Sequence, residues 1–149
     1  MTKVLMVCLG NICRSPLAHG ILEHLANTEG LGWEIDSAGT GNWHIGHSPD
    51  SRSVAVARKM GVDISEQRAR QFEQADFVRF DHILVMDDQN LKNVVALAQS
   101  EEEKQKVRLL LGTDFVPDPY FDDALFEPVY QLIEQGCKQF IAEAKSNKS

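Results

Sequence analysis

Cys8 and Arg14 are the residues whose types and spacing most directly indicate chemistry, because a thiolate is a nucleophile and a guanidinium forks onto anion oxygens. Five residues separate them, and residues 8–16 read CLGNICRSP. Backbone N–H groups of a loop that enters a helix form a nest for an anion. In such a loop Cys8 would lie beneath a bound phosphate, positioned for attack on phosphorus. The same field would lower the pKa of its thiol from ~8.5 to roughly 3.5–7.5.

The residues on either side predict that this segment connects a strand to a helix. Residues 4–7 are a short, uninterrupted apolar run, which is typical of a strand buried on both faces. Gly10 and Asn11 then supply backbone positions that tolerate a positive φ angle. We interpret Ser15 and Pro16 as the N-cap and N1 residues of a helix, since apolar residues recur at helical spacing beyond them.

Both residues also have an ordinary interpretation. A lone cysteine at the end of a buried strand is usually a small apolar residue, and an arginine near a helix start is usually on the surface. Cys8, Arg14 and a loop glycine at this spacing are together much more specific, and they favour the chemical interpretation. The lysine that a nucleotide-binding P-loop requires is absent from the segment, so a nucleotide cradle is not expected.

Asp118 is the candidate general acid, because the oxygen that leaves phosphorus needs a proton. The carboxyl group is followed by Pro119, which restricts its backbone, and by the aromatic Tyr120. Asp-Pro is also common turn chemistry, and Asp122 and Asp123 are nearby rivals without a proline. Beside a Cys-x5-Arg loop, we interpret Asp118 as the acid.

Apolar runs that alternate with helical patterns predict an α/β fold: a single domain, residues 1–149, with a four-stranded parallel sheet between helices on both faces, three layers in all. Strands are expected at residues 4–7, 33–37, 82–86 and 107–111, and helices at residues 16–29, 49–60, 89–99 and 125–144. Residues 62–71 and 101–104 are interpreted as solvated connections. Ligands bind outside the carboxyl ends of parallel strands, so Cys8 and Asp118 are expected to converge there.

Composition limits the possible partners and location. The 149 residues carry a net charge of −7, which argues against a nucleic-acid partner and requires any phosphate site to be local. No apolar run is long enough to span a bilayer and no signal peptide is evident, so a cytoplasmic protein without membrane insertion is expected. The three cysteines are too few for a framework of disulfide bonds, which fits a reducing compartment. His44 and His47 form a weak candidate metal pair, and solvated loop histidines are the preferred interpretation.

The segment CLGNICRSP resembles the signature loop of the low-molecular-weight protein tyrosine phosphatases. Further family landmarks occur in the family's order: residues 36–40 (DSAGT), 69–71 (ARQ), 83–87 (ILVMD) and 118–120 (DPY). The resemblance covers residues 3 to about 144.

The resemblance implies a mechanism without metal or cofactor. Cys8 would be the nucleophile that becomes a phosphocysteine, with Arg14 on the phosphate and Asp118 as acid and base. Ser15 would hydrogen-bond the Cys8 sulfur, and Asn11 would hold the loop through a network that includes Ser15 and Ser37. The phosphate and the substrate would be bound by Leu9, Gly10, Asn11, Ile12, Cys13, Trp43 and Tyr120. Many relatives have histidine where Gln67 stands, which leaves the role of Gln67 open.

Cys13 and Trp43 each keep two interpretations. Cys13 is either a small buried residue or, by resemblance, a partner that forms a reversible disulfide with Cys8 on oxidation. Trp43 is a lid packed on the core, which composition favours, or an aromatic wall of the pocket, which the resemblance favours.

An apolar, aromatic slot above the phosphate would favour phosphotyrosine proteins and small aryl phosphates over the short stem of phosphoserine. Ile12 argues against the protein-arginine phosphatases of this fold, which typically have threonine there. Arsenate reductases use further cysteines in a C-terminal loop, whereas Cys137 is expected in a helix. A non-catalytic phosphotyrosine-binding module would need neither Cys8 nor Asp118.

Phosphate or other oxyanions are expected ligands, and the chain is expected to be a monomer or weak dimer.

Overall fold

The computed structural model describes residues 1–146, and its centre is a parallel sheet with the strand order β2-β1-β3-β4. The strands are β1 (Lys3–Cys8), β2 (Glu34–Gly39), β3 (His82–Val85) and β4 (Val107–Leu109). β1 lies in the middle and pairs with β2 and β3, with Cys8 opposite Gly39 at the carboxyl end. The predicted four-stranded parallel α/β sheet is confirmed.

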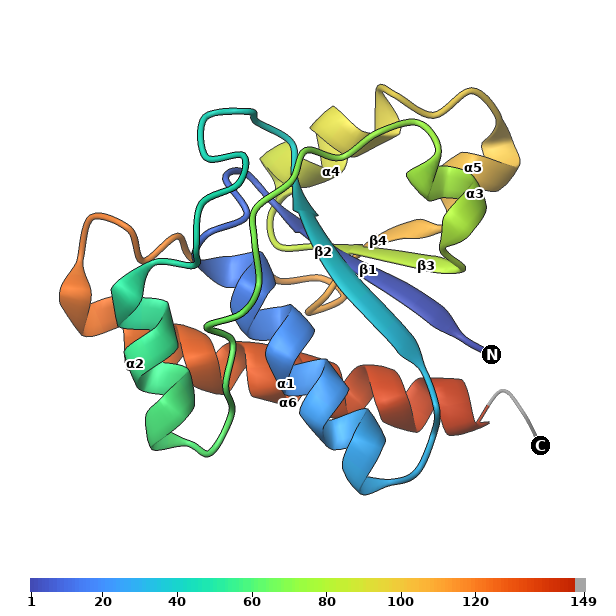
Figure 1. The fold of residues 1–149 in the computed structure, drawn as a ribbon. Helices are drawn as coiled ribbons and strands as arrows, with labels where there is room; N and C mark the ends of the chain where they lie inside the picture. Colours follow the sequence, from blue (N-terminus) through green and yellow to red (C-terminus); the bar gives the residue numbers. More distant parts are fainter. Residues whose placement is uncertain (147–149) are drawn as a thin grey trace.

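Helices cover both faces of the sheet, which gives the predicted three layers (Figure 1). One face carries α1 (Arg14–Thr28), α2 (Ser51–Lys59) and α6 (Phe126–Ser146), and the other carries α3 (Asp76–Arg79), α4 (Asp88–Val95) and α5 (Glu101–Gln105). The helix α6 packs along both α1 and α2.

The alternation of side chains along β1 builds two separate cores. Val4 and Met6 join the core beneath α1 and α6, whereas Leu5 and Val7 join the core on the side of α4. All four side chains are fully buried, and burial of each contributes about 1.5–3 kcal/mol. The same alternation turns Cys8 toward the α1 side, where the next segment begins.

Several boundaries differ from the sequence prediction. The helix α4 ends at Val95, four residues early, and residues 101–105 form the short helix α5 instead of an unstructured link, since the Ser100 side chain caps its N-terminus. The helix α3 was not predicted, because four residues are too few to show a period. A 3-10 turn, η1 (Asp123–Leu125), precedes α6. Within residues 1–146, no helix is both long and apolar enough to cross a bilayer.

Candidate active site

The loop from Cys8 to Arg14 joins the carboxyl end of β1 to the N-terminus of α1. Asn11 has a φ of 58°, the left-handed conformation that asparagine tolerates better than most residues. The prediction that Ser15 caps the helix is wrong. The N-cap is Cys13, which makes no side-chain capping hydrogen bond, and Ser15 lies inside the first turn. Its hydroxyl is therefore free of the helix end and turns back toward the sulfur.

Ser15 and Asn11 together direct a proton toward Cys8. The Ser15 Oγ lies 3.0 Å from the Cys8 Sγ, and the backbone N–H of Ser15 points at the same sulfur at 3.4 Å. The Asn11 side-chain amide donates to the Ser15 Oγ at 2.8 Å. Because that amide occupies the Ser15 oxygen as an acceptor, the hydroxyl proton is available for the sulfur. The hydroxyl and the backbone N–H of Ser15 thus both reach the same sulfur.

The remaining partners of Asn11 come from a distant segment. The Asn11 Oδ1 accepts the backbone N–H of Arg70 at 3.1 Å. The guanidinium of Arg70 is in turn held by Asp36 and by the fully buried Asp76. Ser37, expected in the Asn11 network, instead bonds the Nδ1 of His19 at 3.2 Å.

Gln67 has a different contact again, because its side-chain amide donates to the carbonyl of Pro16 at 3.1 Å. This bond ties the segment after α2 to the first turn of α1.

Arg14 is buried and surrounded by acidic groups. Its Nη1 donates to Asp87 at 2.6 Å and to the carbonyl of Val116 at 2.9 Å, and its Nη2 lies 4.0 Å from Asp118. Burial opposes the charge, but Cys8 and Asp87 outweigh it and raise the pKa of Arg14, so the guanidinium stays charged.

Asp87 is a site residue that sequence reasoning missed. In the sequence it stands out only as the last residue of the family landmark 83–87. Its Oδ1 accepts the N–H of Asn90 as a helix cap, while its Oδ2 holds Arg14. The available signal was its position after the apolar run that forms β3, the strand beside β1.

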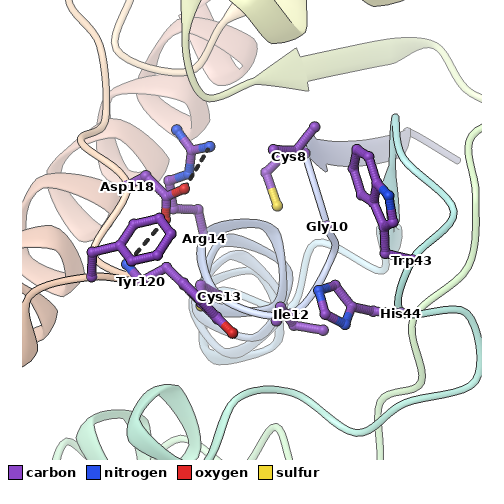
Figure 2. A pocket seen from close by; sticks show the side chains of 11 residues that line it. Cys8, Gly10, Ile12, Cys13, Arg14, Trp43, His44, Asp118 and Tyr120 are labelled. Atoms are coloured by element: carbon purple, nitrogen blue, oxygen red, sulfur yellow. Dashed lines mark hydrogen bonds and ion pairs between the residues drawn. The ribbon is translucent and has the colours of Figure 1, made fainter.

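A cavity of about 220 Å³ opens above the Cys8 sulfur. Figure 2 shows Asp118, Arg14 and Tyr120 on one side of it and Trp43 and His44 on the other. The cavity is lined by Cys8, Leu9, Gly10, Ile12, Cys13, Arg14, Trp43, His44, Asp118, Tyr120 and Phe121.

Nine of the eleven predicted site residues line this cavity. The two exceptions, Asn11 and Ser15, are buried and do not line it. Trp43 lies in the wall with an exposure of 65%, which does not fit a lid packed on the core. His44 and Phe121 line the cavity although neither was predicted to do so.

Of the three neighbouring aspartates, Asp118 alone is in the cavity wall. Its Oδ1 accepts the backbone N–H of Tyr120 at 3.1 Å, which fixes the carboxyl group beside the aromatic ring. Asp122 caps η1, and Asp123 pairs with Arg52 at 2.5 Å. The rival carboxylates are thus engaged in structural contacts.

The other two cysteines differ in position. Cys13 lines the cavity, and burial together with the nearby charge of Asp50 raises the pKa of its thiol to about 12. Cys13 is therefore protonated at neutral pH. Cys137 is fully buried in α6 against Ala18, and burial raises its pKa too. Among residues 1–146, no three histidine, cysteine or acidic side chains form a group that could hold a metal ion.

The parallel α/β sheet presents a cysteine, an arginine and a carboxylic acid in one cavity. The sequence model described as "Low molecular weight phosphotyrosine protein phosphatase" matches residues 3–149. The chain belongs to this family, and it is a protein tyrosine phosphatase by that membership.

Individual proteins agree with this assignment. The low molecular weight protein-tyrosine-phosphatase YfkJ of Bacillus subtilis is 41% identical, with 99% of each chain covered. The crystal structure of the Entamoeba histolytica protein tyrosine phosphatase, solved with Hepes in its active site, has a TM-score of 0.93 at 32% identity over 100% of both chains. A Drosophila arginine phosphatase has a TM-score of 0.90 at 33% identity, with 97% of this chain and 98% of that chain covered.

Proposed function

We propose that this chain hydrolyses phosphotyrosine through a phosphocysteine on Cys8. The Cys8 thiolate attacks phosphorus, the S–P bond forms, and the bond from phosphorus to the tyrosine oxygen breaks. Asp118, as the carboxylic acid, gives its proton to that oxygen. Asp118 then takes a proton from a water molecule, whose oxygen attacks phosphorus and breaks the S–P bond. Phosphate leaves, and the thiolate is restored.

Arg14 and the loop N–H groups would stabilise the charge on the equatorial oxygens of both transition states. Ser15 would stabilise the sulfur as it leaves in the second step, through the hydroxyl proton that Asn11 directs toward it. One observation carries the proposal: segments far apart in the chain bring Cys8, Arg14 and Asp118 to the same cavity.

The substrate is proposed to be a protein phosphotyrosine, with small aryl phosphates as surrogates. The walls formed by Ile12, Trp43 and Tyr120 suit an aromatic ring above the phosphate. We further propose that residues 1–149 act as one phosphatase domain in the cytoplasm, as a monomer or weak dimer, and without a metal or cofactor. Reversible pairing of Cys8 with Cys13 on oxidation is part of the same proposal, since both residues line one cavity.

The test is hydrolysis of p-nitrophenyl phosphate and of a phosphotyrosine peptide in the presence of EDTA. Cys8→Ser is expected to abolish turnover of both substrates. Asp118→Ala is expected to lower turnover of the phosphotyrosine peptide by roughly 10²–10⁴-fold, and that of p-nitrophenyl phosphate by less, since its leaving group needs no proton. Asp122→Ala is the matched control, since it removes a neighbouring carboxylate outside the cavity, and it is expected to keep wild-type rates. A mass increase of one phosphoryl group on Cys8 in quenched Asp118→Ala would identify the intermediate.

Two results would contradict the proposal. Full activity of Cys8→Ser would exclude the phosphocysteine. Hydrolysis of phosphoarginine at a higher kcat/KM than the phosphotyrosine peptide would exclude phosphotyrosine as the preferred substrate.

A further inference from the structure

Arg52, in the first turn of α2, makes ion pairs and ring contacts near the cavity that the proposed mechanism does not use. Its Nε and Nη2 fork onto the Asp50 carboxylate at 3.0 and 2.9 Å, and its Nη1 donates to Asp123 at 2.5 Å. The guanidinium also lies over two aromatic rings, 4.6 Å from the centre of Phe126 and 5.5 Å from that of Tyr120. A planar fork that both pairs and stacks is a role that only arginine fills well.

One side of this cluster is attached to the phosphate-binding loop. The backbone N–H of Asp50 donates to the carbonyl of Ile12 at 2.7 Å, and the hydroxyl of Ser53 donates to the carbonyl of Cys13 at 3.4 Å. The start of α2 is therefore fixed to the loop that carries the nucleophile. Arg52 extends from that fixed point.

The other side is attached to the general acid. Arg52 contacts the Tyr120 ring, and the Tyr120 backbone N–H bonds the Asp118 carboxylate at 3.1 Å. Asp123 anchors the far end of the same segment. Figure 1 shows the start of α2 next to the loop that precedes α6, and α2 and α6 are in contact.

We propose that Arg52 is a positioning residue that sets the distance between the phosphate-binding loop and the Asp118–Tyr120 turn. This role rests on the proposed function of Asp118 as the general acid. Ion pairs at the protein surface contribute little to stability. The contacts of the partly exposed Arg52 guanidinium with two carboxylates and two rings are therefore better explained by a role in positioning these groups than by a role in stability. Without the contacts of Arg52, Tyr120 and Asp118 would be free to move together relative to Cys8.

The test compares kcat/KM for phenyl phosphate and p-nitrophenyl phosphate. Phenol has a pKa of about 10, like tyrosine, and needs the acid, whereas p-nitrophenolate leaves readily without a proton. Arg52→Met is expected to lower kcat/KM for phenyl phosphate by roughly tenfold to hundredfold, and for p-nitrophenyl phosphate by much less. Arg52→Lys keeps the cation between Asp50 and Asp123 but cannot fork or stack, and it is expected to show a smaller loss with the same substrate order.

Arg108→Met is the matched control. Arg108 also pairs with a carboxylate, Glu143 at 2.9 Å, and lies over a phenyl ring, Phe140 at 5.6 Å, but it does not border the active-site cavity. Its substitution is expected to leave both kcat/KM values at the wild-type level.

A double-variant comparison decides whether Arg52 acts through Asp118. In the Asp118→Ala background, Arg52→Met is expected to have no further effect on the ratio of the two kcat/KM values. Equal losses on both substrates, or a selective loss that persists without Asp118, would overturn the positioning role. If Arg52→Met does not fold, Arg52→Lys carries the same comparison. If Asp118→Ala itself shows no preference between substrates, the proposed acid is wrong and the positioning role fails with it.

Discussion

Gly39→Ala tests whether activity depends on the exact path of the phosphate-binding loop. Gly39 ends β2, and a Cβ there would lie 2.9 Å from the Leu9 carbonyl oxygen, 3.0 Å from the Gly10 carbonyl carbon and 3.1 Å from the Asn11 nitrogen. All three are backbone atoms of the loop, so no side-chain rotation relieves the contact.

The size of the response follows from that geometry. Gly39 cannot retreat, because its N–H donates to the carbonyl of Arg70 at 2.8 Å and its carbonyl accepts from Phe72 at 2.7 Å. To move from 2.9 Å to the 3.4 Å of ordinary contact, the loop has to shift by ~0.5 Å. Since a 1 Å misplacement can cost about 100-fold in rate, we expect kcat/KM to fall by about tenfold. Overpacking should also lower the free energy of unfolding by about 1–3 kcal/mol.

The assay is p-nitrophenyl phosphate hydrolysis, with inorganic phosphate as a competitive inhibitor, and thermal unfolding of the same samples. The inhibition constant for phosphate should rise together with the loss of kcat/KM, because both report the loop. Gly136→Ala is the control: the nearest atoms to its Cβ would belong to the side chains of Leu110 and Leu111, both at 2.9 Å, and neither leucine lines the cavity. It should change stability alone. Wild-type activity in Gly39→Ala, with only its melting temperature lowered, would refute the reasoning.

Three further predictions follow from other contacts. Asp76→Asn removes the buried charge that holds Arg70, and it should lower the free energy of unfolding in urea by about 2–3 kcal/mol; an unchanged midpoint would contradict this. Asn11→Ala forces alanine into a φ of 58° and deletes the amide at the loop centre, so kcat should fall more than KM rises in steady-state kinetics, and a pure KM effect would argue against it. The Arg52 hydrogen bond lowers the pKa of Asp50, so its stabilising effect is present above the unfolded-state value of about 3.9 and is lost as the pH falls through the folded value. As the pH falls below about 5, wild type should lose melting temperature faster than Asp50→Asn, and parallel curves would exclude the linkage.

Local patterns in the chain predict the secondary-structure elements and the first candidate residues of the site. Residues 4–7 are apolar at every position, which predicts a strand buried on both faces. The Cys-x5-Arg segment begins at the next residue in the chain. The parallel arrangement then placed Asp118 at the same edge as Cys8, because crossovers bring the carboxyl ends of all strands to one side. These inferences use short-range patterns and one topological rule.

The contacts that support the site depend on how the elements pack against one another. A cap and an interior first-turn position differ by one or two residues, so Ser15 was misassigned, and its hydroxyl serves the sulfur instead of the helix end. Asp87 and Arg52 both read locally as ordinary helix-start residues, yet each reaches a partner in another segment. Hydrogen bonds between distant side chains leave no period in a sequence, because they depend on how the packed elements are oriented. The residues proposed to react could therefore be predicted from the sequence. The side chains that position them could be identified only from the folded structure.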